Sequence, residues 1–325
     1  MTEFILRRLL QTILVLIVMT VLVFFGVHVI GNPADLFASS ECTRACLAEI
    51  EANLGLDRPV WQQYLIFLGN IAQGDLGRSF QFGVPAMSLI WERFPATLEL
   101  ALASVILALA IGLPLGIYAG LRPKSLASRA IMGFSMIGFS VPVFWIGLIL
   151  ILTFSVRLGW FPAIGRGDTV ELFGVPFSFL TLDGLRHLAM PAVTLSLLMM
   201  SMVIRLTRAG LREVMTSDYI RFARANGVPE RRIIGWHAMK NILIPIVTVL
   251  GMELGGVIAF AVVTESIFSW PGVGKMLIDA ITVLDRPLIV AYLIFVVTMF
   301  VILNLVIDIL YSLLDPRMRP GAGSA

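Results

Sequence analysis

Long apolar stretches alternate with short polar stretches along most of this chain. A helix that crosses the hydrocarbon of a bilayer needs about 20 predominantly apolar residues, and six stretches reach or approach that length. They are residues 9–30, 96–119, 130–156, 187–204, 242–263 and 288–310. The pattern therefore predicts an all-α fold, that of a polytopic membrane protein with six transmembrane helices.

The first apolar stretch is expected to remain in the mature protein. It has 22 residues, whereas the apolar core of a signal peptide has about 7–15 and is followed by an Ala-x-Ala-like site. Six spans place both termini on one side of the membrane. With the N-terminus inside, 15 Lys and Arg fall on the cytoplasmic side and 9 outside. This bias agrees with the positive-inside rule, so both termini are predicted to be cytoplasmic.

Prolines and glycines predict where the apolar helices begin and bend. Pro95 suits the first turn of the second helix, which would place Glu99 close to the positive end of the helix dipole. Residues 112–116, Gly-Leu-Pro-Leu-Gly, predict a kink near the inner end of that helix. Pro142 interrupts the third stretch, and Pro191 is expected in the first turn of the fourth. We interpret these prolines as static features of membrane helices.

The outer segment 31–95 is more than a tether, because apolar stretches such as 61–68 predict short helices within it. It contains both cysteines of the chain, Cys42 and Cys46. On a helix, residues four apart have Cα atoms within the range of about 4.4–6.8 Å that a disulfide requires. A disulfide between Cys42 and Cys46 and a pair of free thiols both remain open.

Composition and motifs exclude soluble proteins and several enzyme classes. The chain is 58% hydrophobic and 14% charged, against about 45–50% and 25% in soluble domains. The Gly-rich stretch 272–275 fails as a phosphate-binding loop, because Ser269 and Met276 stand where Gly and Ser or Thr are required. The three histidines are too far apart in the sequence to share a helical metal site: His28, His187 and His237. We therefore predict neither catalysis nor a metal site.

The polar interval 205–240 has a different character from the other connections. It carries eight Lys and Arg against three acidic residues, a net charge of +5. Within it the sequence predicts two short helices. Asp218 suits an N-cap and Gly227 a left-handed helix end, while Pro229 followed by Glu230 suits the first turn of a second helix.

The first of these short helices is expected to dock on another surface. It has about nine residues, and isolated helices below about 12–15 residues are marginal in water. Its spacing places Tyr219, Phe222, Ala223 and Asn226 on one face. That face could bind a protein, or it could lie among lipid headgroups as an amphipathic linker. The sequence pattern alone leaves both alternatives open.

The interval resembles the cytoplasmic loop of ABC-importer permeases of the dipeptide, oligopeptide and nickel subfamily. The subfamily pattern is Asp-Tyr-(Ile/Val)-x-x-Ala-Arg-Ala-x-Gly, followed by His, Asn and Pro. The matching residues are Asp218, Tyr219, Ile220, Ala223, Arg224, Ala225, Gly227, His237, Asn241 and Pro245. Arg221 and Phe222 depart from the broader pattern of ABC importers, as the peptide subfamily does. The stretches 75–79, 265–272 and 315–317 also resemble that subfamily.

This resemblance implies a type I ABC importer permease fold in a bacterial cytoplasmic (inner) membrane. It implies a second homologous permease, two cytoplasmic ATPase subunits and an extracytoplasmic solute-binding protein as partners. ATP and Mg would bind to the ATPases, and this chain would hold no cofactor. The loop would be the coupling helix that receives ATPase closure. Its residues in that role would be Asp218, Tyr219, Phe222, Ala223, Arg224, Ala225, Gly227 and His237. The substrate would be a dipeptide, an oligopeptide, a glutathione-like peptide or a nickel chelate.

The predicted organisation has three parts. Residues 1–95 form the first span and the outer segment, residues 96–313 form a five-helix core with the coupling loop 205–241, and residues 314–325 form a cytoplasmic tail. Within the core, Glu253 is predicted near mid-membrane, where a charge costs about 2.5–3.5 kcal/mol on insertion scales. It either lines the translocation path or is protonated or bridges two helices. A self-sufficient secondary transporter or channel is the alternative function, with Glu253 as its main support.

Overall fold

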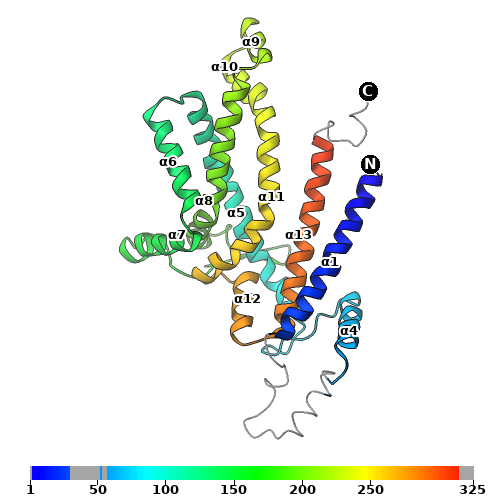
Figure 1. Cartoon of the computed structure of the whole chain (residues 1–325). Helices are drawn as coiled ribbons and strands as arrows, with labels where there is room; N and C mark the ends of the chain where they lie inside the picture. The colour runs from blue at the N-terminus through cyan, green and yellow to red at the C-terminus, as the bar shows by residue number, and fades with distance from the viewer. Residues whose placement is uncertain (1, 30–51, 53–56, 315–325) are drawn as a thin grey trace. The chain divides into compact units, whose positions relative to one another are not determined.

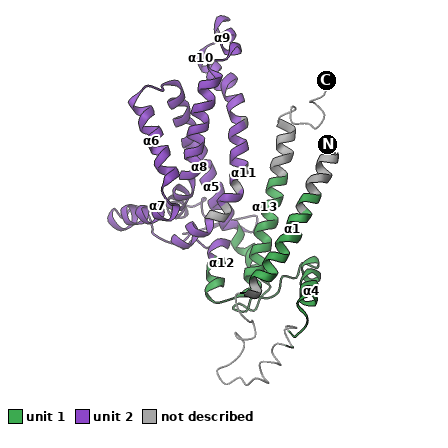
Figure 2. Cartoon of the chain, viewed as in Figure 1, with its two compact units in different colours: residues 1–94, 276–305, 319–325 green, residues 95–275, 306–318 purple. Residues whose placement is uncertain are grey.

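The structure is a computed structural model, and it describes residues 2–29, 52 and 57–314. The chain forms two compact units (Figure 2): residues 1–94, 276–305 and 319–325 make unit 1, and residues 95–275 and 306–318 make unit 2. Each unit is described separately. Cys42 and Cys46, and the predicted family motif at 315–317, lie outside the described residues.

Unit 1 contains helix α1 (Thr2–Val29), α4 (Val60–Ala72), most of α12 (Val273–Thr282) and most of α13 (Arg286–Leu314). The short helix α4 confirms the expectation for 61–68. It contacts α1 through a hydrogen bond of 3.0 Å between the hydroxyls of Thr20 and Tyr64. The Phe24 ring lies 5.3 Å from the Tyr64 ring and 5.5 Å from the Phe67 ring, centroid to centroid.

A buried carboxylate fastens the loop around residue 79 in unit 1. Asp285, between α12 and α13, is fully buried and accepts a hydrogen bond from the Ser79 hydroxyl. It also accepts backbone N–H bonds from Phe80 at 3.1 Å and Gln81 at 3.3 Å. A carboxylate removed from water requires such donors. The loop around residue 79 is therefore tied to the start of α13.

Unit 2 is a helical bundle built around α8 (Leu182–Val214), with α6 (Leu126–Ser140), α11 (Met239–Ile267) and most of α5 (Ala86–Leu121) beside it (Figure 1). Its apolar core is formed mainly by α5, α8 and α11. Its shorter elements are α7 (Val143–Leu150), the π-helix η1 (Ile151–Arg157), β1 (Val170–Leu172), β2 (Val175–Phe177), α9 (Asp218–Ala225), α10 (Glu230–Arg232) and the π-helix η2 (Ile233–Ala238).

Three glycines spaced four residues apart on α5 bring its backbone against α8. A β-carbon on any of them would lie within 3.0 Å of a side-chain atom of α8. The facing pairs are Gly112–Val203, Gly116–Thr207 and Gly120–Leu211. Small residues at this spacing allow membrane helices to approach closely. Gly112 and Gly116, from which a kink was predicted, thus belong to a helix-packing surface together with Gly120.

The connection between η1 and α8 carries the two strands, an exception to the helical structure of unit 2. Strands β1 and β2 pair antiparallel, with Val170 opposite Phe177. Phe173 and Gly174 both have positive φ, 54° and 77°, as the central residues of a type I′ hairpin turn do. Phe173 is 96% exposed, so the hairpin presents an aromatic side chain at its tip.

The helix boundaries differ from the expectations for two helices. Helix α5 begins at Ala86, so Pro95 lies inside the helix and Glu99 is not in its first turn. Helix α8 begins at Leu182, with Thr181 as its N-cap, so Pro191 is not in its first turn. In both, the helix continues through charged residues, such as Glu92 and Arg93 in α5 and Asp183 and Arg186 in α8, beyond the stretch that hydropathy marks.

Bends decide how many described helices can cross a bilayer. Three are long and apolar enough: Ala86–Leu121, Leu182–Val214 and Arg286–Leu305. The predicted third span is broken at Pro142, where its two halves meet at 109°, and the segment Glu230–Val257 bends by 41°. Counting each bent pair as one span gives up to five in the described residues, and α1 adds a shorter apolar stretch, Ile13–Gly26. The count of six stays a prediction.

Candidate functional site

The predicted coupling helix is present as α9, beyond the adjoining ends of α8 and α11 (Figure 1). Its N-cap is Ser217, so the prediction of Asp218 as N-cap is wrong by one residue, and Asp218 occupies the first turn. There its carboxylate still favours the positive end of the helix dipole.

The C-terminus of α9 confirms the role expected for Gly227. Its φ is +75°, and its N–H donates to the Arg224 carbonyl at 2.9 Å. The N–H of Val228 donates to the Ala223 carbonyl at 3.1 Å. These two bonds form a Schellman motif, which satisfies carbonyls that the helix end leaves free.

The second short helix differs from the expectation. It begins at Glu230, with Pro229 as its N-cap, and continues through η2 into α11. The chain after the turn is thus an extension of a core helix. Half-buried His237 lies in this π-helical extension.

Two side-chain hydrogen bonds and packing against η2 hold α9 against the chain that follows it. The Arg224 guanidinium donates to the Glu230 carboxylate at 2.6 Å, and this hydrogen bond raises the pKa of Arg224 above its usual range. Asn241 donates to the Tyr219 hydroxyl at 2.6 Å. Ile220 of α9 is fully buried, and α9 packs against η2. A helix too short to be stable alone is therefore positioned by its own chain.

The outer surface of this segment exposes aromatic side chains. Phe222 is 71% exposed and Trp236, on η2, is 68% exposed, while Tyr219 is 43% exposed. Sequence spacing had suggested that the stripe containing Phe222 docks. Ile220 is the buried residue of α9, all of which the structure describes, and it lies outside that stripe. Phe222 of the predicted stripe is thus exposed, while the Tyr219 hydroxyl is bonded to Asn241. Of the remaining predicted residues, Asp218, Arg224 and Ala225 lie on α9, Gly227 follows it, and His237 lies on η2.

Glu253, the predicted residue of the core, lies at the centre of α11 and is half-buried. It contributes the carboxylate to a pocket that is otherwise apolar. The other lining residues are Val143, Leu195, Leu198, Met199, Gly256 and Val257. Glu253 is well separated from the α9 segment along α11, so the structure does not bring the two predicted sites together.

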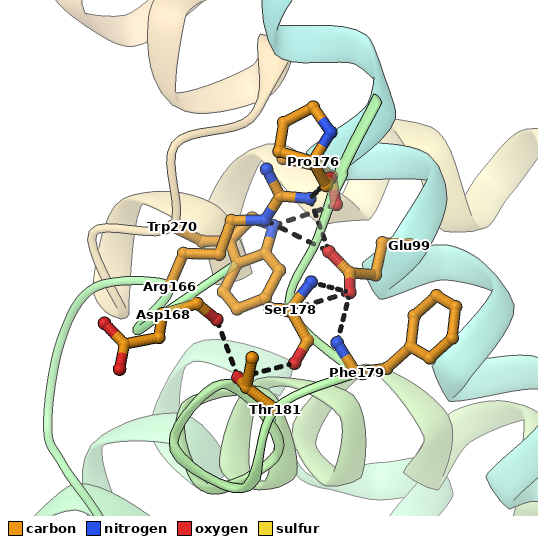
Figure 3. A network of polar contacts seen from close by, with 9 residues as sticks. Glu99, Arg166, Asp168, Pro176, Ser178, Phe179, Thr181 and Trp270 are labelled. Atoms are coloured by element: carbon orange, nitrogen blue, oxygen red, sulfur yellow. Dashed lines mark hydrogen bonds and ion pairs between the residues drawn. The ribbon is translucent and has the colours of Figure 1, made fainter. Parts of the chain in front are cut away.

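Sequence reasoning missed a buried ion pair in unit 2 (Figure 3). One oxygen of the Glu99 carboxylate lies 2.6 Å from the Arg166 guanidinium. The other accepts hydrogen bonds from the Ser178 N–H at 2.7 Å and the Phe179 N–H at 2.8 Å. Arg166 also donates to the Pro176 carbonyl at 2.7 Å. The Glu99 charge, first interpreted as a partner of the helix dipole, instead anchors the hairpin loop to α5.

A second buried carboxylate, Glu265, caps α12. It is fully buried, accepts from the Thr97 hydroxyl at 2.6 Å and accepts from the Lys275 N–H at 2.9 Å. The Thr97 hydroxyl in turn accepts from the Val273 N–H at 2.9 Å. A β-carbon at Gly274 would lie 2.6 Å from the Val262 α-carbon. The sequence signal available for this contact was an isolated acidic residue, Glu265, a few residues before the Gly-Val-Gly stretch 272–274.

The sequence matches two family models. Residues 112–320 match the binding-protein-dependent transport system inner membrane component, and residues 1–101 match the N-terminal part of such membrane components. The chain belongs to this family. Its members are permeases, which agrees with the apolar helices and multi-pass character described above.

Curated permeases match nearly the whole chain. The di/tripeptide transport system permease protein DppB of Pseudomonas aeruginosa is 40% identical, with 98% of this chain and 99% of that protein covered. The dipeptide transport system permease protein DppB of Escherichia coli K12 is 38% identical over the same shares. The oligopeptide transport system permease protein AppB of Bacillus subtilis is 39% identical, covering 98% and 100%.

The fold is similar to that of a solved importer. A structure of the MetNI methionine ABC transporter in inward-facing conformations matches with a TM-score of 0.53 and 16% identity. The match covers 70% of this permease and 97% of that chain. It supports the fold expected for a type I ABC importer permease.

Proposed function

We propose that this permease forms half of the translocation pathway of an ATP-driven importer for di- or oligopeptides. The names of its relatives support the peptide class. The observation that carries the proposal is the exposed Phe222 on a helix that its own chain holds rigidly. An exposed aromatic side chain on a positioned helix is suited to fill a pocket on a partner.

The partners in this proposal supply the energy and the substrate. Two cytoplasmic ATPases bind ATP and Mg, a second homologous permease completes a heterodimeric pathway, and an extracytoplasmic binding protein delivers the peptide. This chain itself hydrolyses nothing and binds no cofactor. ATPase closure moves α9, and because η2 is continuous with α11, the movement passes directly into a core helix. The permease sits in a bacterial inner membrane with both termini in the cytoplasm.

The residues proposed for the coupling role fall into groups that make different contacts. Phe222 and Ala223 face the ATPase, whereas Tyr219 and Arg224 hold α9 through Asn241 and Glu230. Asp218 and Ala225 belong to the two ends of the helix, Gly227 ends it, and His237 lies on the extension. The proposal assigns binding to the first pair and positioning to the second.

The test is purification of the tagged permease in mild detergent, with identification of the proteins that co-elute. We expect two ATPases and a second permease with the unaltered chain, and loss of the ATPases from a Phe222→Ala variant. Phe173→Ala is the matched control, because that side chain is 96% exposed on the outer hairpin and its loss should leave the ATPases bound. A chain that elutes alone and transports without ATP would support the secondary transporter instead.

A further inference from the structure

The pocket at Glu253 places one carboxylate deep in the apolar part of unit 2. Glu253 is 14 residues from each end of α11 (Met239–Ile267), or about 21 Å along the axis at 1.5 Å per residue. An ionisable residue inside a membrane segment is costly and usually faces a partner or a water-filled path. We therefore expect the Glu253 carboxylate to contact a positively charged group.

The described chain supplies no such group. Glu253 makes no hydrogen bond or ion pair with any described residue. Arg205 is six residues beyond Met199, the pocket residue of α8 nearest to it in sequence, and its guanidinium lies 4.5 Å from the Phe139 ring centroid. His187, near the other end of α8, pairs with Asp183. The basic side chains on α8 are thus engaged elsewhere or displaced along the helix.

The pocket wall beside the carboxylate is apolar, and the cavity is small, about 10 Å³, which is enough for one water-sized group. Leu195, Leu198 and Met199 come from α8, and Val143 comes from the start of α7. Gly256 lies one turn beyond Glu253, and even an added β-carbon there would remain 3.5 Å from Glu253 Oε2. A single anion flanked by Met and Leu side chains suits a small cation that carries an apolar substituent. The flexible thioether of methionine adapts to substituents of different shape.

We propose that Glu253 receives the protonated α-amino group of a peptide in transit, with the adjoining side chain of the peptide against Leu198 and Met199. This inference rests on the proposed function. A contact between an ammonium and a carboxylate stabilises the charged amino terminus where water is scarce. Transport requires that such a site be weak enough to release its ligand. One carboxylate in a partly open pocket meets that condition, since no second anion holds the amine.

The experiment uses the complete transporter in liposomes, with saturating peptide-loaded binding protein. ATP-driven uptake is compared for a dipeptide with a free amino group and for its desamino analogue. We expect Glu253→Gln to slow uptake of the amino peptide roughly tenfold, as for the loss of one charge-assisted contact, and to leave the analogue unchanged. Glu171→Gln, which removes an exposed carboxylate of β1 outside the pocket, should leave the uptake of both peptides unchanged. Because the same binding protein loads every variant, its own preference cancels between variants.

The outcomes separate this inference from the function on which it rests. Wild-type uptake that does not require ATP would overturn the proposed function. ATP-driven uptake in which Glu253→Gln treats both peptides as the wild type does would overturn the amine site and leave the proposed function standing. Loss of the second permease from purified Glu253→Gln would also overturn the amine site, because Glu253 would then pair with a cation of that subunit.

Discussion

Gly116 on α5 faces Thr207 on α8 so closely that a β-carbon at position 116 would lie 2.6 Å from the Thr207 β-carbon. The backbone carbonyl of Ile204 would lie 3.0 Å from the same added atom. Neither neighbour can move without shifting α8 itself. The α5–α8 contact of unit 2 therefore depends on the absence of a side chain at this position.

Replacement of Gly116 by Ala should destabilise the permease. Overpacking of a tight contact costs about 1–3 kcal/mol, and the expected result is a lower thermal unfolding temperature in detergent. Gly133→Ala on α6 is the matched control, because a β-carbon there meets nothing within 4 Å and Ala favours a helix by about 1 kcal/mol. Equal stability of the two variants would show that α5 and α8 can separate without cost.

Replacement of Glu99 by Ala should destabilise the outer loop strongly. It would leave the Arg166 guanidinium, 11% exposed, without its carboxylate, and breaking a buried pair costs about 3–5 kcal/mol. Faster proteolysis within residues 157–181 is the measurement. A double variant, Glu99→Gln with Arg166→Met, should recover part of the protection because it removes both charges. No recovery would indicate that the backbone N–H bonds to Glu99 dominate.

Replacement of Thr97 by Val should loosen the start of α12. The Thr97 hydroxyl donates to Glu265 and accepts from Val273, so the variant leaves two buried polar groups short of a partner, at about 1–3 kcal/mol each. Hydrogen exchange at residues 273–275 should accelerate. Thr97→Ser keeps the hydroxyl and should restore slow exchange; failure to do so would assign the effect to the lost methyl group.

Replacement of Gly227 by Ala should weaken coupling through the backbone alone. A β-carbon there meets nothing within 4 Å, but the φ of +75° costs an L-residue about 1–2 kcal/mol. We expect reduced co-purification of the ATPases and slower ATP-driven uptake, with membrane insertion unchanged. Gly227→Asn should be milder, since Asn tolerates this conformation. Gly235→Ala, which also meets nothing within 4 Å, should behave as wild type.

Much of this protein follows from local sequence. Apolar stretches of membrane length predict helices because a bilayer leaves the backbone no other partner for its hydrogen bonds. Gly227 predicts a helix end because few residues adopt positive φ without cost. Pro142 predicts a break for an equally local reason, the loss of an N–H donor and a steric clash. The family pattern around Tyr219 is likewise contiguous in sequence, so it could be recognised without a fold.

Only the tertiary structure shows which polar side chains contact one another. Glu99 and Arg166 are separated by 67 residues and Thr97 and Glu265 by 168, so no local pattern reports either contact. The sequence also did not reveal that η2 is continuous with α11. Gly227 and Pro229 mark where a helix ends or starts, but they do not show which later helix it continues into. Burial also decided which residue of α9 its own chain covers, placing Ile220 inward while Phe222 stays outward as expected of a docking face. A single sequence specifies its helices through short-range geometry, whereas pairing of charges and burial of faces depend on neighbours that folding brings from far along the chain.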